Sequence, residues 1–277
     1  MRKIETHSFA IAKQQIDLMM KATKPFHRSN WQGLDVSSKP EMAIHELRHV
    51  SIDVDLRGVE ELKWYRDTIK PNLPWADDHF DERVCGYPLN PGTQWKHWPW
   101  GQSADKFREA SGIFNHNYME RYWAKHAEAA PEPTLLATDF ARFKIEASPL
   151  NQGIRGRYGD LNDVVAKLVN EPTTRQAILP IYFPEDTALL TGRQPCSMYY
   201  HFMLDDKKRL DVVYPMRSCD YRRHWADDVY MTVRLLIWVL EQARKQNAFF
   251  DEVKPGQFVM HIANLHVFRN DYTEMFK

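Results

Sequence analysis

The last third of the chain combines several strand-like segments with a single long apolar helix, and this order leaves few possible folds. Three short segments with strand character, 177–183, 198–204 and 210–216, are separated by turn residues. A strongly apolar stretch typical of a helix follows at 227–246, and 258–268 has the pattern of a further strand. Strands and helices do not alternate regularly. The sequence therefore predicts an α+β fold with a large, mostly antiparallel or mixed twisted sheet packed with helices.

The first two thirds of the chain contain further expected elements. Helices are expected at 8–22, 59–69, 117–128 and 160–170, and a short strand at 52–56, where apolar residues alternate with aspartates. No internal repeat, low-complexity tract or Gly/Ser linker divides the chain. Residues 1–277 are therefore predicted to form one domain.

The composition is that of a soluble globular protein, with 43% hydrophobic and 27% charged residues. The 37 Lys+Arg residues balance the 37 Asp+Glu residues. This balance argues against direct binding of nucleic acid or of an anionic membrane, since either would require a basic excess. The longest apolar run, Leu235 to Leu240, is too short to cross a membrane. Three cysteines and no apolar leader favour a reducing, cytoplasmic location.

A pentapeptide in the first third, His45-Glu46-Leu47-Arg48-His49, matches the HExxH pattern. On a helix, its two histidines would share one face and could bind zinc, while the glutamate would activate a water molecule. The strand-like segment 52–56 follows almost at once and leaves little room for such a helix. A zinc peptidase is thus an alternative, and the main expectation is that the protein has no metal site.

A second group of polar residues lies in the last third. Cys196 precedes one predicted strand and Arg217 follows the next. A cysteine reacts as its thiolate, and a nearby guanidinium lowers the thiol pKa. Asp228 lies at the start of the apolar helix, where an aspartate is also a common N-cap. Taken alone, Cys196 would be a small buried apolar residue, as is expected of Cys85 and Cys219.

An ordered series of motifs resembles the thymidylate synthase family. The motifs are Glu61-Leu62-Lys63-Trp64-Tyr65, Tyr158-Gly159, the helix end at 170–175, Gln194-Pro195-Cys196, Arg217-Ser218-Cys219-Asp220 and Leu265-His266-Val267. The resemblance is good from about residue 155 onward, and none is visible over about 68–145. That aromatic, proline-rich segment is expected to be an insertion atypical of the family, either a lid or stacking surface or a packed insertion. Within the family, the chain looks most like the bacteriophage deoxycytidylate hydroxymethylases.

The resemblance implies roles for the matching residues. The expected catalytic residues are Cys196, Glu61 and Tyr158, the expected substrate-binding residues are Arg175, Arg217, Ser218, Asp228 and His266, and Asp220 is expected to bind the cofactor. That cofactor would be 5,10-methylenetetrahydrofolate. In the family, the Arg175 position reaches into the partner's site. A homodimer formed through the sheet is therefore expected.

Asp228 bears on the choice of base. Family members that act on uracil have an asparagine here, whose amide accepts from N3–H and donates to O4. Cytosine presents an amino group at C4 and an unprotonated N3. A carboxylate accepts from that amino group and favours protonation at N3, but it has no donor for the O4 of uracil. The residue type therefore favours a cytosine nucleotide.

The expected function is folate-dependent hydroxymethylation of dCMP at C5, with Cys196 adding to C6. The product would serve the synthesis of modified-base DNA, in the host cytoplasm if the protein is viral. The alternatives within the family are a dCMP methyltransferase and a thymidylate synthase or hydroxymethylase that acts on dUMP. Gln176 replaces a second phosphate-binding arginine and Phe268 replaces a tyrosine near the sugar. An inactive nucleotide-binding homologue therefore stays open as a further alternative.

Overall fold

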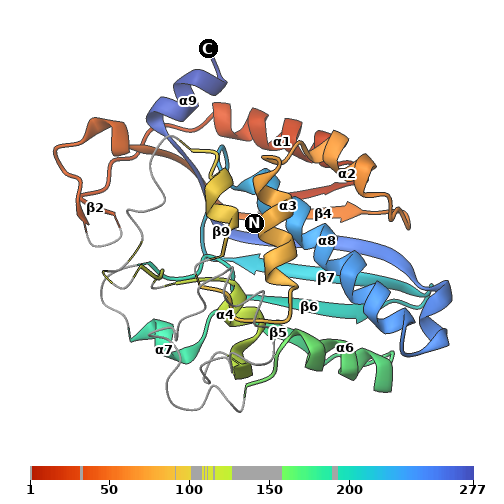
Figure 1. Cartoon of the computed structure of the whole chain (residues 1–277). Helices are drawn as coiled ribbons and strands as arrows, with labels where there is room; N and C mark the ends of the chain where they lie inside the picture. The colour runs from red at the N-terminus through yellow and green to blue at the C-terminus, as the bar shows by residue number, and fades with distance from the viewer. Residues whose placement is uncertain are drawn as a thin grey trace.

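One large mixed sheet runs through the computed structural model of the chain (Figure 1). Its strands lie in the order β1, β4, β9, β7, β6, β5, and β8 also pairs with β9. Their bounds are Arg2–Thr6 for β1, Ile44–Asp55 for β4, Ala177–Pro180 for β5, Tyr199–Leu204 for β6, Arg209–Met216 for β7, Cys219–Asp220 for β8 and Lys254–Phe268 for β9. The β1–β4, β7–β9 and β8–β9 pairs are parallel and the others are antiparallel. The predicted α+β class with a mixed sheet is thus confirmed.

The structure describes residues 2–31, 34–90, 92–100, 108, 110, 112–114, 116–126, 158–188 and 193–277. A separate two-stranded sheet pairs β2 (Asn30–Trp31) with β3 (Leu34–Asp35). Much of the segment 68–145 that showed no family resemblance, including all of 127–145, lies outside the described residues. Of the helix expected at 117–128, only α4 (Met119–Tyr122) and a following 3₁₀ turn (Ala124–His126) form.

Helices cover one face of the sheet (Figure 1). They are α1 (Phe9–Lys21), α2 (Leu62–Ile69), α3 (Trp75–Arg83) and α8 (Trp225–Arg244), and α6 (Leu161–Asn170) packs against α8 and β5. The remaining elements are α7 (Pro184–Thr187), α9 (Arg269–Met275) and the 3₁₀ turns Pro40–Met42, Gln94–His97 and Ala248–Glu252. The helices expected at 8–22, 59–69, 160–170 and 227–246 correspond to α1, α2, α6 and α8.

The longest helix, α8, forms the centre of the core. Its apolar residues recur at helical spacing, so that Val229, Val233, Leu236 and Leu240 are all fully buried. Beneath it, every second residue of β7 is buried and the intervening residues are half-exposed. This alternation follows from the two-residue period of a strand. It identifies the face of the sheet that receives the helices.

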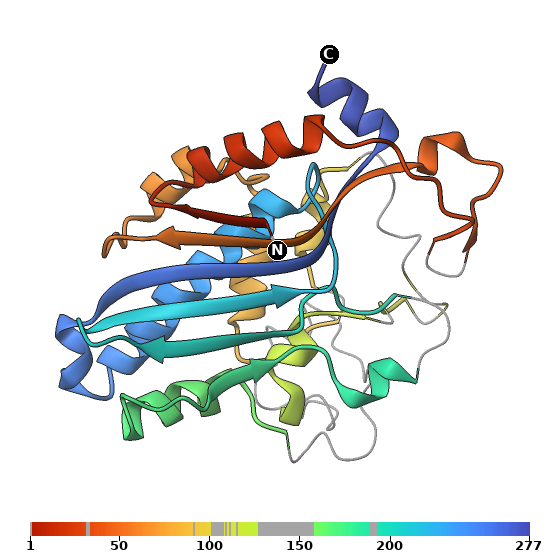
Figure 2. The ribbon, with the colours of Figure 1, turned by 180° about the vertical axis from the view of Figure 1, so that it is seen from behind.

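The opposite face of the sheet carries no helix among the described residues (Figure 2). The residues that point to this side include Val213 and Val259 at the centre and the exposed Ile178 and Tyr199 near the β5 edge. We call this surface the open face. A sheet face with apolar residues commonly packs against a second layer.

Candidate active site

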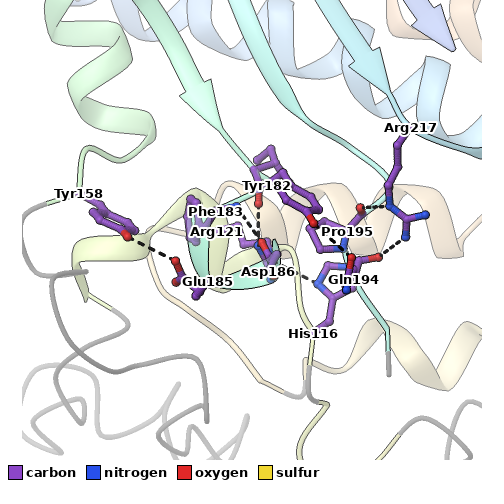
Figure 3. A network of polar contacts seen from close by, with 11 residues as sticks. His116, Arg121, Tyr158, Tyr182, Phe183, Glu185, Asp186, Gln194, Pro195 and Arg217 are labelled. Atoms are coloured by element: carbon purple, nitrogen blue, oxygen red, sulfur yellow. Dashed lines mark hydrogen bonds and ion pairs between the residues drawn. The ribbon is translucent and has the colours of Figure 1, made fainter. Parts of the chain in front are cut away.

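Cys196 and Arg217 meet at one end of the sheet because β6 and β7 are antiparallel neighbours. Cys196 precedes β6 and Arg217 follows β7, and the Arg217 amide donates to the Cys196 carbonyl at 2.9 Å. The Arg217 guanidinium lies over the same turn, donating from Nε to the Pro195 carbonyl at 2.8 Å and from Nη2 to the Gln194 carbonyl at 2.9 Å (Figure 3). An arginine has more N–H donors than these two bonds use. The exposed guanidinium is thus oriented and can still bind an anion.

The Cys196 thiol is half-buried, and its environment opposes ionisation in the free protein. Burial raises its pKa, and the carboxyls of Asp228 and Asp220 raise it further. The cations Arg217 and Arg193 act in the opposite direction and offset part of this effect. The net shift is upward. The thiol is therefore mostly protonated at neutral pH until something near it adds positive charge or removes the proton.

Asp228 lies in the first turn of α8 and is not its N-cap. The N-cap position is His224, and the Asp228 amide already donates to the His224 carbonyl at 2.8 Å within the helix. The Asp228 Oδ2 lies 3.8 Å from the Cys219 Sγ. Burial raises the pKa of Asp228 to about 7. The N-cap alternative for this residue is therefore wrong, and its carboxyl is left available for another partner.

Ser218, Asp220 and His266 lie beside this group through the pairing of β8 with the end of β9. The Ser218 Oγ is 3.4 Å from the His266 Nδ1, and Asp220 is the register partner of His266. Burial lowers the pKa of His266 to about 4 and raises that of Asp220 to about 6. The residues that the structure gathers here are Cys196, Arg217, Ser218, Asp220, Asp228 and His266, which we call the cysteine cluster.

Tyr158 and Arg175 lie outside the cysteine cluster. The Tyr158 hydroxyl contacts the Glu185 Oε2 at 3.4 Å, and Figure 3 shows it at the side of the polar network opposite Arg217. Arg175 is exposed at a bend before β5, where its carbonyl bonds to the His201 Nε2 at 3.0 Å. Its expected role in a partner's site stays a prediction.

Glu61 lies at the other end of the sheet from Cys196. It is the exposed N-cap residue of α2, which begins after the turn at Gly58. In that turn, the Gly58 amide donates to the Pro255 carbonyl, at the start of β9. At the Cys196 end of the sheet, Met216 pairs with Ile262, which lies much further along β9. A local motif does not fix where its helix begins relative to the sheet. The structure thus gives no geometric support to the proton-transfer role expected of Glu61.

Tyr118, which lies beside Cys196, and Arg83, which packs on Tyr118, were not identified as site residues from the sequence. The Tyr118 hydroxyl accepts a hydrogen bond from the Ser197 Oγ at 3.2 Å, and burial raises the pKa of Tyr118 to about 12. The Arg83 guanidinium carbon lies 4.3 Å from the centroid of the Tyr118 ring. Both residues come from the segment 68–145, where no motif pointed to them, although Tyr118 falls within the helix expected at 117–128.

An aromatic group borders Asp220. The ring of Trp100 lies 4.4 Å from that of Trp98 and 4.3 Å from that of His224, measured between centroids. The His224 amide donates to the Asp220 carbonyl at 2.9 Å. Both indoles are half-buried. Both indoles also pack edge-to-face on Trp75 and against the core, so the choice between a stacking surface and a packed insertion stays a prediction.

The HExxH pentapeptide is part of a strand. All five residues lie in β4, where His45 stacks on Tyr272 at 3.5 Å and Glu46 binds Arg28 and Asn264 at 3.0 and 2.6 Å. In the described ranges, no group of three or more His, Cys, Asp or Glu side chains has the arrangement of a metal site. The zinc-peptidase alternative is therefore wrong. A membrane crossing would also need a longer apolar helix than any in the described part of the chain.

Comparison with known proteins agrees with this geometry. The family model described as thymidylate synthase matches residues 75–277, which is more than half of the chain. The chain belongs to the thymidylate synthase family. The matched range contains the whole cysteine cluster and most of the segment 68–145, but it begins after Glu61. That 68–145 is an atypical insertion stays a prediction.

Two known proteins resemble this thymidylate synthase family member. The bifunctional dihydrofolate reductase-thymidylate synthase of Zea mays is 24% identical over 160 residues, which are 57% of this chain and 29% of the maize protein. The chain thus spans less than a third of that relative. The crystal structure of thymidylate synthase from T4 phage superposes with a TM-score of 0.54 at 13% identity, covering 95% of this chain and 78% of that one. The chain therefore has the thymidylate synthase fold.

The thymidylate synthase family uses methylenetetrahydrofolate as its cofactor, and the residues near Asp220 suit such a group. A pterin is flat and presents N–H donors. The half-buried indoles of Trp98 and Trp100 offer flat surfaces, and the Asp220 carboxyl can accept from N–H groups. The backbone amide of Arg223 already occupies the Asp220 Oδ1 at 3.0 Å. The Arg223 Nε lies 3.8 Å from the other oxygen, Oδ2. That Asp220 binds the cofactor stays a prediction.

Proposed function

We propose that this protein transfers a one-carbon unit to C5 of dCMP and releases 5-hydroxymethyl-dCMP. The observation that carries this proposal is the Asp228 carboxyl, which lies beside Cys219 and interacts electrostatically with Cys196. A carboxylate at this point matches the amino group of cytosine and offers no donor to uracil O4. The membership of the family supports the transfer chemistry, and Asp228 supports the choice of base.

Cys196 starts the reaction by adding its sulfur to C6 of the pyrimidine. The new S–C6 bond shifts electron density to C5, which becomes nucleophilic. Methylenetetrahydrofolate, when bound, would supply the one-carbon unit that C5 takes up and would leave as tetrahydrofolate, so the oxidation level of the carbon does not change. The C5 proton then leaves, water adds to the exocyclic carbon, and loss of the Cys196 sulfur from C6 restores the aromatic ring.

The other residues of the cysteine cluster position the nucleotide. The exposed Arg217 guanidinium and the Ser218 hydroxyl face the 5′-phosphate, and a bidentate guanidinium–phosphate contact is strong. Arg217 alone balances only part of the negative charge of the phosphate. Further cations are therefore needed at this position. Arg175 of a second copy is the proposed source of that charge. His266 meets the sugar, and Tyr118 rather than Tyr158 lies against the reacting ring.

A homodimer through the open face completes this proposal. The open face holds apolar side chains at its centre and edge, with Ile178 at 41% and Tyr199 at 37% exposure. Association would cover them. It would also allow the exposed Arg175, which lies outside its own cysteine cluster, to reach a neighbouring site.

The test is release of tritium from C5-labelled dCMP, with and without methylenetetrahydrofolate, in parallel with C5-labelled dUMP. We expect folate-dependent release from dCMP that is lost in Cys196→Ala and kept in Cys85→Ala, a matched control at an exposed cysteine. The mass of the product then separates hydroxymethyl-dCMP from methyl-dCMP.

Equal release from dUMP and dCMP would contradict the selection by Asp228 and favour a uridylate enzyme. No release from either nucleotide, together with tight dCMP binding, would identify an inactive nucleotide-binding homologue.

A further inference from the structure

Arg83 is a buried cation that pairs with no anion among the described residues. It ends α3 with 2% exposure, and its guanidinium carbon lies 4.3 Å from the ring centroid of Tyr118 and 5.8 Å from that of Tyr122. Its Nε has no hydrogen-bond partner. In the described part of the chain, no carboxylate forms an ion pair with it. A buried charge without a counterion is unfavourable, so a negative charge nearby is strongly favoured.

Asp228 is the complementary group. It lies on α8, which packs against α3, and it forms no ion pair among the described residues. Its neighbour Asp227 is already occupied, since its two oxygens accept from the Asn72 amide and side chain at 2.7 and 2.8 Å. Asp228 has only the weak Cys219 contact at 3.8 Å. Two buried groups of opposite sign thus lie on packed helices, and neither forms an ion pair with another residue in the part of the chain that the structure describes.

Among the groups around Asp228, burial and Asp227 oppose its ionisation, and Arg83 and the Cys219 thiol favour it. Asp227 on α8 raises the pKa of Asp228, burial raises it more, and Arg83 and the Cys219 thiol lower it. The charge of Asp228 also raises the pKa values of groups on the other packed elements, namely Cys196, Tyr118, Tyr122 and Tyr214. All of these are neutral or become negative. Arg83 is the cation in this set.

We propose that Arg83 is a positioning residue that keeps the Asp228 carboxyl ionised and thereby sets the preference for cytosine over uracil. A protonated Asp228 has an O–H donor for uracil O4, and an ionised one has none. The charge on a single carboxyl therefore changes which base fits. The inference about selectivity rests on the proposed function, whereas the effect of Arg83 on Asp228 does not.

The direct test is an NMR titration of protein labelled at the aspartate carboxyl carbons. The Asp228 resonance is assigned by its loss in Asp228→Asn. We expect a midpoint near pH 7 in the unaltered protein and a midpoint higher by about one pH unit in Arg83→Gln, since an opposite charge nearby moves a carboxyl by one or more units. Arg83→Lys, which keeps the charge, should retain the lower midpoint.

The same midpoint in Arg83→Gln and the unaltered protein would overturn the inference. Circular dichroism checks that each variant is folded. If Arg83→Gln does not fold, Arg83→Met fills the same space with an uncharged, unbranched chain and takes its place.

The selectivity is tested by the ratio of tritium release from dCMP to that from dUMP. At pH 7.5 we expect this ratio to fall by about tenfold in Arg83→Gln, matching the shift of about one unit, and to recover at pH 9, where Asp228 is ionised again. A ratio that does not change with pH would contradict the link to selectivity. If the unaltered protein releases no tritium at all, the proposed function fails, and the NMR titration still decides whether Arg83 acts on Asp228.

Discussion

At the scale of single residues, two tyrosines are candidates for the place against the reacting ring. Tyr118 shares a hydrogen bond with Ser197, the residue after Cys196, and Tyr158 contacts Glu185 on α7. A hydroxyl that takes part in proton transfer typically contributes a factor of about 10²–10⁴ to the rate. We expect Tyr118→Phe to lower tritium release from dCMP by about 100-fold, whereas the matched Tyr158→Phe should change it only slightly. A larger loss in Tyr158→Phe would reverse this assignment.

The adjacent glutamates 60 and 61 allow a second comparison between matched variants. Glu60 bonds to Arg244 at 2.8 and 2.9 Å and to Lys254 at 3.1 Å, and Glu61 is exposed. We expect Glu61→Gln to keep both the rate and the melting temperature. Glu60→Gln should lower the free energy of unfolding by about 1 kcal/mol, because a partly buried network of charges is lost. A large loss of turnover in Glu61→Gln, with the fold intact, would restore the role that its motif implied.

Site residues could be predicted from the sequence where they belong to short motifs of neighbouring positions. Cys196, Arg217, Ser218 and Asp220 lie in short motifs next to strands, and pairing of those strands brings them together. Arg83 ends α3 and Tyr118 precedes α4. Tertiary packing alone brings Tyr118 to Ser197, beside Cys196, and Arg83 to Tyr118. No local pattern in the sequence encodes that approach.

At the scale of elements, the β7–β9 pair contains an irregularity that involves a carboxyl. The register shifts between Leu210 and Val212, and there the Asp211 Oδ1 accepts from the Gln257 amide at 2.7 Å. A Cβ at Gly256 would lie 2.1 Å from that oxygen, so the close approach requires glycine. Burial raises the pKa of Asp211 to about 6, above its ordinary value of 3.8.

This shift makes stability depend on pH in a direction that can be worked out. Between pH 3.8 and about 6 the folded protein holds more protons than the unfolded chain at Asp211, so stability falls as pH rises through that window. Asp211→Asn should remove the decrease in the free energy of unfolding that Asp211 causes as pH rises. The free energy of unfolding should therefore be about 2 kcal/mol higher in the variant at pH 7.5. Thermal unfolding at pH 4.5 and 7.5 measures it. An equal loss between the two pH values in the variant and the unaltered protein would contradict this expectation.

Elements with a clear period were predictable, and their ends were less so. The strands β5, β6, β7 and β9 and the helices α1, α6 and α8 follow from apolar spacing. The start of α8 at Trp225, two residues earlier than expected, removed the N-cap interpretation of Asp228. The HExxH residues were correctly expected to form no zinc site, because this motif binds zinc only on a helix and these residues lie in a strand.

At the scale of the whole molecule, the open face and the remote Arg175 lead to one prediction. If two copies share each site, Cys196→Ala and Arg175→Ala are each inactive alone. Mixed and allowed to exchange subunits, they should regain about a quarter of the activity of the unaltered enzyme, since half of the dimers then hold one complete site.

The control for this experiment uses the open face itself. Val259→Lys places a charge at the centre of that face and should give monomers in light scattering and no recovery on mixing. Recovery that persists with monomeric protein, or no recovery from mixed dimers, would contradict a shared site.

The position of β9 in the sheet has a consequence for how the chain is made. β9 joins the β1–β4 side to the β7–β6–β5 side and pairs with β8, yet it follows all of them in the sequence. During synthesis, the two sides of the sheet therefore leave the ribosome as separate halves with unpaired edges. They can join only when β9 has emerged, and the same event delivers His266 to the cysteine cluster. Assembly of the sheet and completion of the site are thus a single late step, during which the nascent chain depends most on protection from aggregation.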